Sequence, residues 1–253
     1  MSTYTFMSTA PAKLFVEFSK GNLEVQATET DETTVEIDGD DAEDLVVEQS
    51  GDTINITEPH KGPFGRSRSY EITVTLPSRS QLRARTGSAD IAVQGVLRAA
   101  WLQTGSGDVR IGRVTEEFQV ESGSGDVEAD TLDGRTSIKS GSGDIRIGTV
   151  HDLQTKTGSG GVEIDEVEGD VSHSTGAGDF AIHSVSAGRI SVKGASADVR
   201  IGIPNGTPVW TDVNTVTGRC TSTVESAGAP AEGEPYVELR TTTVSGDVTL
   251  VGL

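Results

Sequence analysis

Residues 104–109 read Thr-Gly-Ser-Gly-Asp-Val, and close variants of this phrase return about every eighteen residues through the middle of the chain. The aspartate position of the phrase is occupied by Asp90, Asp108, Asp126, Asp144, Gly161, Asp179 and Asp198, at steps of 18, 18, 18, 17, 18 and 19 residues. A fixed period this short is typical of a solenoid, in which each repeat buries its apolar face only by stacking on its neighbours. The repeat therefore predicts an architecture, but it does not indicate a chemical activity.

Between two copies of the phrase, polar and apolar residues alternate. Segments 109–111 and 118–120 each place one polar residue between two apolar ones, and a turn is expected around residues 112–117. Strict alternation predicts half-buried strands. Two short strands and two turns per repeat predict an all-β fold, a flattened parallel β-solenoid with about 18 residues per turn. We expect it to be right-handed, because parallel crossovers are overwhelmingly right-handed.

The repeats suggest one domain spanning residues 1–253. Residues 86–202 carry the regular repeats, residues 1–85 are strand-like without the phrase, and residues 203–253 contain a last echo of it. We expect the first and last of these segments to be irregular β caps, because an open solenoid end would be an adhesive sheet edge.

Composition narrows the partners and the compartment. The net charge of −19 disfavours general affinity for nucleic acid or for an anionic membrane. Cys220 is the only cysteine, so no disulfide framework is expected. The first ten residues lack the basic and apolar regions of a secretory signal, and no stretch approaches the length of an apolar membrane span. These features predict a cytoplasmic location.

Charge is distributed unevenly along the first hundred residues. No Lys or Arg occurs between Lys20 and Lys61, while acidic residues are frequent from Glu24 to Glu58. A basic stretch follows, containing Lys61, Arg66, Arg68, Arg79, Arg83, Arg85 and Arg98. The two segments are either solvated faces that partly neutralise each other or an electrostatic docking surface for a partner.

Several further phrases accompany the repeat. They are Ser19–Val25 (Ser-Lys-Gly-Asn-Leu-Glu-Val), Ile72–Pro77 (Ile-Thr-Val-Thr-Leu-Pro), Thr215–Arg219 (Thr-Val-Thr-Gly-Arg) and Thr243–Asp247 (Thr-Val-Ser-Gly-Asp). Together with the Gly-Ser-Gly-Asp phrase, they resemble the bacterial "putative adhesin" family, a β-solenoid domain of unknown function. The resemblance covers nearly the whole chain. It implies a binding or structural role and supplies no catalytic residues.

The repeat aspartates are expected to form a column along one edge of the stacked repeats. Because neighbouring carboxylates repel each other, something must compensate their charge. In one interpretation, each aspartate caps its own Gly-rich turn by accepting backbone N–H bonds. In the other, calcium lies between repeats, with Asp108, Asp126 and Asp144 as ligands. We favour the turn caps, because only one turn of each repeat is rich in Gly and Asp and because Gly161 interrupts the column.

No catalytic or cofactor site is predicted. The four histidines, His60, His151, His173 and His183, share no metal-binding spacing. His173 falls at a position that is apolar in other repeats, which predicts a buried, hydrogen-bonded histidine. No base is placed beside the repeat serines, and no phosphate-binding motif follows the Gly-Ser-Gly phrases.

Trp101 is expected to face outward beside the inward Leu102, close in sequence to Arg83 and Arg85. Either it packs under the N-terminal cap, or it is an exposed anchor for a partner. The sequence therefore predicts a non-enzymatic interaction protein, with a protein partner held at Arg83, Arg85 and Trp101 and with self-association left open. A calcium-dependent or self-assembling structural protein and a carbohydrate-active solenoid enzyme are the alternatives.

Overall fold

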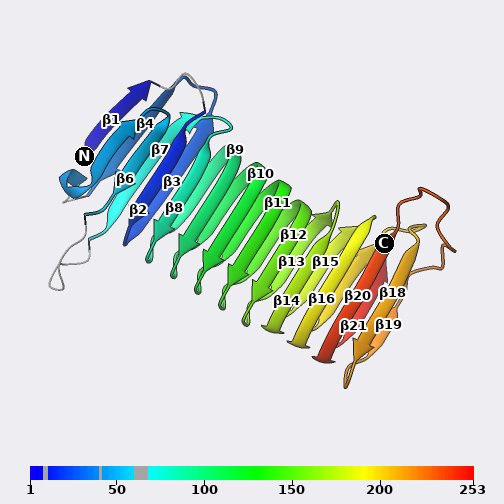
Figure 1. Cartoon of the computed structure of the whole chain (residues 1–253). Helices are drawn as coiled ribbons and strands as arrows, with labels where there is room; N and C mark the ends of the chain where they lie inside the picture. The colour runs from blue at the N-terminus through cyan, green and yellow to red at the C-terminus, as the bar shows by residue number, and fades with distance from the viewer. Residues whose placement is uncertain (8–10, 40–41, 60–67) are drawn as a thin grey trace. The chain divides into compact units, whose positions relative to one another are not determined.

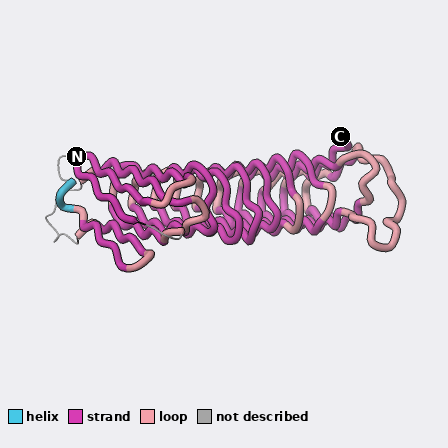
Figure 2. Tube along the Cα trace, turned by 90° about the horizontal axis from the view of Figure 1, so that it is seen from above, coloured by secondary structure: helices cyan, strands magenta, loops and turns pink. Residues whose placement is uncertain are grey.

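The computed structural model describes residues 1–7, 11–39, 42–59 and 68–253. In these ranges the chain is almost entirely strand, and the helical element is the three-residue 3-10 turn η1 (Ala42–Asp44) (Figure 2). No helix in the described ranges has the length and apolar character needed to cross a membrane. The all-β prediction is confirmed, and most strand pairs are parallel. The chain divides into two compact units, Met1–Ala129 and Asp130–Leu253.

The first unit contains two runs of hydrogen-bonded strands (Figure 1). One run consists, in spatial order, of β5 (Val46–Ser50), β6 (Thr53–Thr57), β2 (Lys13–Phe18), β8 (Gln81–Thr86) and the later halves of β9 (Asp90–Thr104) and β10 (Val109–Ser122). The other consists of β1 (Ser2–Met7), β4 (Glu32–Asp38), β7 (Tyr70–Pro77), β3 (Gly21–Thr28) and the earlier halves of β9 and β10. Only the pairs β1–β4, β4–β7 and β5–β6 are antiparallel among those described in this unit.

The second unit also contains two runs, and every described pair in it is parallel. One run consists of the earlier half of β12 (Ile145–Thr157), then β13 (Val162–Val167), β15 (Phe180–Val185), β17 (Val199–Ile203), β21 (Val248–Gly252) and β19 (Cys220–Ser222). The other consists of the later half of β12, then β14 (Val171–Ala177), β16 (Gly188–Ser196), β20 (Val237–Ser245) and β18 (Val209–Thr215). Strand β11 (Val127–Ser140) contains the boundary between the units.

Spatial order differs from sequence order near both ends of the chain. In the first unit, β2 pairs with β6 and β8, and β3 pairs with β7 and β9. In the second unit, β20 pairs with β16 and β18, and β21 pairs with β17 and β19. Part of the segment expected to form the N-terminal cap, β2 and β3, therefore lies inside the parallel runs.

The repeats contain longer strands than the alternation suggested. A turn was expected at residues 112–117, but β10 continues from Val109 to Ser122 and stays paired to β9 through two register shifts. A β-bulge of this kind bends a strand without ending its pairing. The bend is therefore made inside one strand.

The core of each unit consists mainly of Val, Ile, Leu and Ala side chains, with a few aromatic ones. Val109, Ile111, Phe118 and Val120 are all at most 3% exposed, as the alternation predicted. Close stacking of successive turns requires glycine at Gly107, immediately before Asp108. A Cβ on Gly107 would lie 1.9 Å from the carbonyl oxygen of Ala89 in the preceding turn, a distance that no real side chain tolerates.

Candidate functional site

Strands β2, β8, β9 and β10 present outward side chains that lie directly beside one another. The parallel register places Phe15, Arg83, Trp101 and Gln119 in one row across the four strands. Two residues further along each strand, a second row contains Glu17, Arg85, Gln103 and Glu121. Neighbouring strands are about 4.8 Å apart, so side chains within a row contact one another.

The structure thus brings together the three residues singled out from the sequence. The guanidinium carbon of Arg83 lies 5.3 Å from the centre of the Trp101 ring, a cation–π distance. Trp101 is half-buried and faces outward, as predicted, while Leu102 beside it is only 3% exposed. Arg85 lies on the same face of β8 as Arg83. Within the described ranges, neither guanidinium forms an ion pair.

Two hollows adjoin this pair. The first, of about 320 Å³, is lined by residues of both rows, including Phe15, Arg85 and Gln103. The second, of about 260 Å³, is lined by Lys13, Thr53 and Gln81 among others. Arg83 and Trp101 line both. We call this face, defined by Phe15, Arg83, Arg85, Trp101 and the residues of the two hollows, the arginine–tryptophan face.

The basic and acidic segments of the sequence are only partly described. Lys61 and Arg66, together with His60, lie outside the described residues. Arg68 forms an ion pair with Asp44, so the two segments partly neutralise each other there. Lys13 likewise pairs with Asp52 at 2.9 Å, and the hydrogen bond from Lys13 lowers the pKa of the Asp52 carboxyl.

The repeat aspartates form hydrogen bonds that differ from the predicted turn caps. The backbone N–H of Asp108 donates to Asp90 Oδ1 at 2.8 Å, and that of Asp126 donates to Asp108 Oδ1 at 3.0 Å. In the second unit, the N–H of Gly161 donates to Asp144 Oδ1 at 3.0 Å. Each of these aspartates therefore bonds to the next repeat in sequence. For Asp90 and Asp108, this bond replaces the expected cap of the residue's own turn within the described ranges, so the turn-cap expectation was wrong there.

A hydroxyl residue closes the turn instead, a role that the sequence reasoning missed. The N–H of Gly107 donates to Thr104 Oγ1 at 3.0 Å, and Ser122 Oγ donates to the carbonyl oxygen of Gly125 at 2.9 Å. The signal was present in the sequence, since the phrase nearly always begins with Thr or Ser. These side chains are buried, so their hydroxyls satisfy backbone groups that water cannot reach.

Within the described ranges, no group of three or more His, Cys, Asp or Glu side chains is placed to hold a metal ion. Charge on the aspartate edge is partly balanced by arginine: Arg110 lies 3.7 Å from Asp108 and 3.4 Å from Glu128. His173 is 1% exposed and hydrogen-bonded to Thr155, as its sequence position predicted.

Comparison with solved structures gives matches of low identity. A putative adhesin from Bacteroides fragilis is 11% identical, with a TM-score of 0.47 over 100% of this chain and 96% of that one. A putative lipid binding protein from Parabacteroides distasonis is 14% identical, with a TM-score of 0.41 over 98% of this chain and 96% of that one. No protein of curated function matches the chain.

The sequence itself provides the assignment. Residues 12–251 match the family described as Toastrack DUF4097. The matched range includes nearly all of both units. This match confirms the resemblance inferred from the repeated phrases. The chain is a member of the Toastrack DUF4097 family.

Proposed function

We propose that this protein is a non-enzymatic binding module that holds a protein partner on the arginine–tryptophan face. The observation that carries the proposal is the pairing of Arg83 with Trp101 beside Arg85, on an outward sheet face with hollows on both sides. Aromatic and arginine side chains dominate the binding energy of many protein interfaces, because they combine large contact area with directed hydrogen bonds.

Electrostatics support a partner that presents carboxylates. The protein carries a net charge of −19, so most of its surface repels a partner that presents carboxylates. Such a partner is attracted only where cationic side chains lie together, as Arg83 and Arg85 do. Arg83 and Arg85 form no ion pair in the described ranges, although Glu17 stands next to Arg85 in its row, and their donors can bind an incoming carboxylate. Trp101 holds the guanidinium of Arg83 in place, which lowers the ordering cost of binding.

The face also has an apolar part, which supplies contact area for a partner. Phe15 and Trp101 lie on either side of Arg83 in one row, and both are partly exposed. An extended segment with an apolar side chain next to an acidic one fits a row of this kind, since side chains of an extended chain alternate at the spacing of the sheet.

The proposal extends to the chain as a whole. We propose one domain of 253 residues wound right-handed with about 18 residues per turn, located in the cytoplasm. Support comes from the spacing of the repeat, from the rarity of left-handed parallel crossovers and from the single cysteine.

Charge reversal tests the face. The double variant Arg83→Glu/Arg85→Glu, used as bait in extracts of the native host, should lose a protein that the unmodified chain retains. Quantitative mass spectrometry of the captured proteins measures this loss. Trp101→Ala should weaken the same capture, because it removes contact area and frees the Arg83 side chain. Because the attraction is ionic, capture by the unmodified chain should also fall as salt rises.

The matched control reverses two exposed cations elsewhere, Lys193→Glu/Arg200→Glu on β16 and β17. It changes net charge by the same amount and should keep the partner. A partner that survives reversal at Arg83 and Arg85 but is lost with the control would place the binding site elsewhere and overturn the proposal.

A further inference from the structure

The chain of aspartate hydrogen bonds is interrupted at Gly161. Asp144 accepts the N–H of Gly161, but Gly161 has no carboxylate to offer the N–H of Asp179, the next residue in the column. The carboxylate of Asp179 also differs from those of Asp90, Asp108 and Asp144, because each of the other three accepts a backbone N–H from the next repeat. In the described part of the chain, neither the backbone N–H nor the carboxylate of Asp179 has a hydrogen-bond or ion-pair partner.

The backbone does not require glycine at this position. A Cβ on Gly161 would meet Asp144 Oδ1 at 3.5 Å and the carbonyl oxygen of Asp179 at 3.7 Å, which are ordinary van der Waals distances. The adjacent Gly160 is the opposite case, since a Cβ there would lie 2.0 Å from the carbonyl oxygen of Gly143. An aspartate therefore fits at 161, and its absence leaves a space.

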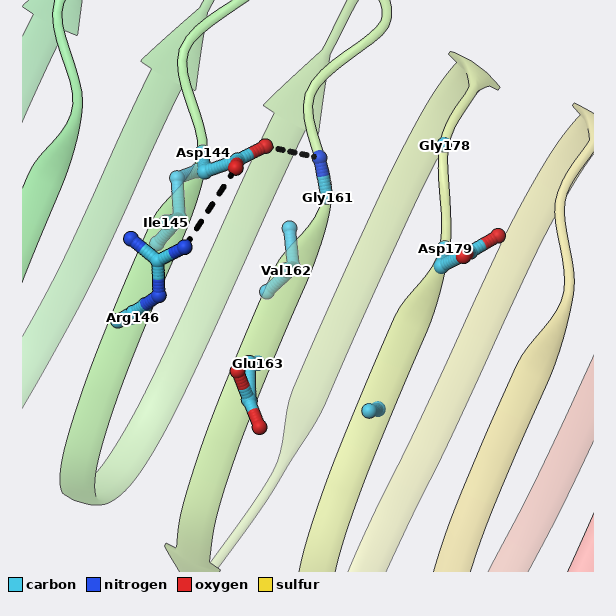
Figure 3. A pocket seen from close by; sticks show the side chains of 9 residues that line it. Asp144, Ile145, Arg146, Gly161, Val162, Glu163, Gly178 and Asp179 are labelled. Atoms are coloured by element: carbon cyan, nitrogen blue, oxygen red, sulfur yellow. Dashed lines mark hydrogen bonds and ion pairs between the residues drawn. The ribbon is translucent and has the colours of Figure 1, made fainter.

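That space is a hollow of about 510 Å³ on the surface of the second unit (Figure 3). Its lining includes the half-buried Ala181, and its rim carries Asp144, Arg146, Glu163 and Asp179. The side chains of Ile145 and Val162 face the core and are at most 2% exposed, so only their backbone borders the hollow. In Figure 3 the Arg146 guanidinium turns toward Asp144, with its Nη2 3.6 Å from Asp144 Oδ2, and away from Glu163. Glu163 instead contacts His183 Nε2 at 2.8 Å.

The polar groups of the hollow select the chemistry of a ligand. The lining residues include three carboxylates and one guanidinium, so an anion is repelled. The groups at the rim are complementary in kind: the Asp179 N–H has no acceptor in the described ranges, and the Glu163 carboxylate can accept from a donor, whereas the Asp179 carboxylate points away from Gly161 in Figure 3. A hydroxyl group supplies both at once. The volume lies within the ordinary range for small-molecule sites.

We propose that the hollow at Gly161 binds a neutral polyhydroxylated ligand, a sugar ring. One hydroxyl oxygen takes the place of the missing aspartate oxygen and accepts the Asp179 N–H. A hydroxyl also donates to the Glu163 carboxylate, and the carbon face of the ring covers Ala181. This site is separate from the arginine–tryptophan face and does not depend on the function proposed there.

The test uses a printed array of neutral oligosaccharides together with acidic ones that carry uronic or sialic acid. The unmodified chain should bind at least one neutral oligosaccharide, whose affinity is then measured by calorimetry. Gly161→Asp should weaken that affinity by at least about ten-fold, because its carboxylate occupies the hollow and takes the Asp179 N–H. Its melting temperature should equal or exceed that of the unmodified chain. Glu163→Ala should weaken binding without filling the hollow, because it removes the carboxylate that accepts from the ligand.

Ser174→Asp is the matched control. It adds the same charge at an exposed position on β14, between Lys156 and Lys193 in the register, and should bind as the unmodified chain does. Three results would each overturn the proposal: no neutral oligosaccharide bound by the unmodified chain, undiminished binding by Gly161→Asp, or a response confined to acidic oligosaccharides.

Discussion

His173 is an ionisable side chain inside an otherwise apolar and hydroxyl-lined core. Its ring stacks on Phe180 at 4.7 Å between centroids, and Nδ1 contacts Thr155 Oγ1 at 2.7 Å. Burial lowers the pKa of His173 from 6.5 to about 4, because the charged ring would lose its hydration. The unfolded chain therefore binds a proton at a higher pH than the native state does.

The consequence is a pH-dependent loss of stability. The contribution of neutral His173 is fully present above pH 6.5 and decreases as the pH falls toward about 4, because only the unfolded state is protonated in that window. The loss from this residue reaches roughly 3 kcal/mol at the acid end. Urea titrations at several pH values should show a steeper decline for the unmodified chain than for His173→Val. Parallel declines would show that another group controls the acid response.

Two substitutions of Asp108 test the hydrogen bonds between successive repeat aspartates. Asp108 Oδ1 accepts the Asp126 N–H, and Asn can keep that acceptor while Ala cannot. Asp108→Ala should lower the free energy of unfolding by about 1–2 kcal/mol, and Asp108→Asn by much less. Thermal unfolding with and without chelator measures both. A calcium site would behave differently, since Asn would then be nearly as damaging as Ala and the chelator would reproduce the effect.

At the scale of the strand, inward and outward positions differ sharply in what they tolerate. Ile145 is 0% exposed in β12, while Arg146 beside it is exposed. Ile145→Asp should lower the free energy of unfolding by about 3 kcal/mol or more, because it buries an unpaired carboxylate. Arg146→Ala removes only an exposed contact and should cost under about 1 kcal/mol. Melting temperatures compare the two, and equal shifts would contradict the register.

The sequence predicted such positions well because alternation directly reports which side of a strand is buried. It identified Val109 and Phe118 as inward, and it placed Trp101 outward. It missed the continuity of β10 through residues 112–117, because a bulge leaves the same irregular pattern as a turn. The spatial neighbours of β2 were also beyond prediction, since nothing in residues 13–18 specifies which distant strand they join.

Part of each candidate site could also be predicted from the sequence. Arg83 and Arg85 share one face because they are two residues apart, which sequence reveals. Their placement beside Phe15 depends on the insertion of β2 between β6 and β8, which it does not. The hollow at Gly161 was visible only as a break in the column. That the break leaves an open space, and not a tighter turn, is known only from the distances around Gly161 in the structure.

At the scale of the whole molecule, each unit contains one pair of strands that lies between strands distant in sequence. Both edges of these inserted strands are hydrogen-bonded. β2 and β3 are paired on both sides in the first unit, and β20 and β21 are paired on both sides in the second. The outermost strands differ between the units. Antiparallel β1 and β5 occupy these positions in the first, whereas parallel β18 and β19 do so in the second.

The order of β18 to β21 has a consequence for synthesis on the ribosome. β18 and β19 emerge before β20 and β21, yet in the native unit the later pair separates them from β16 and β17. Until residues 237–252 have emerged, the nascent chain exposes the open edges of β16 and β17. The Gly- and Pro-containing segment 223–236 therefore delays closure of these two edges until the last strands of the chain have been made.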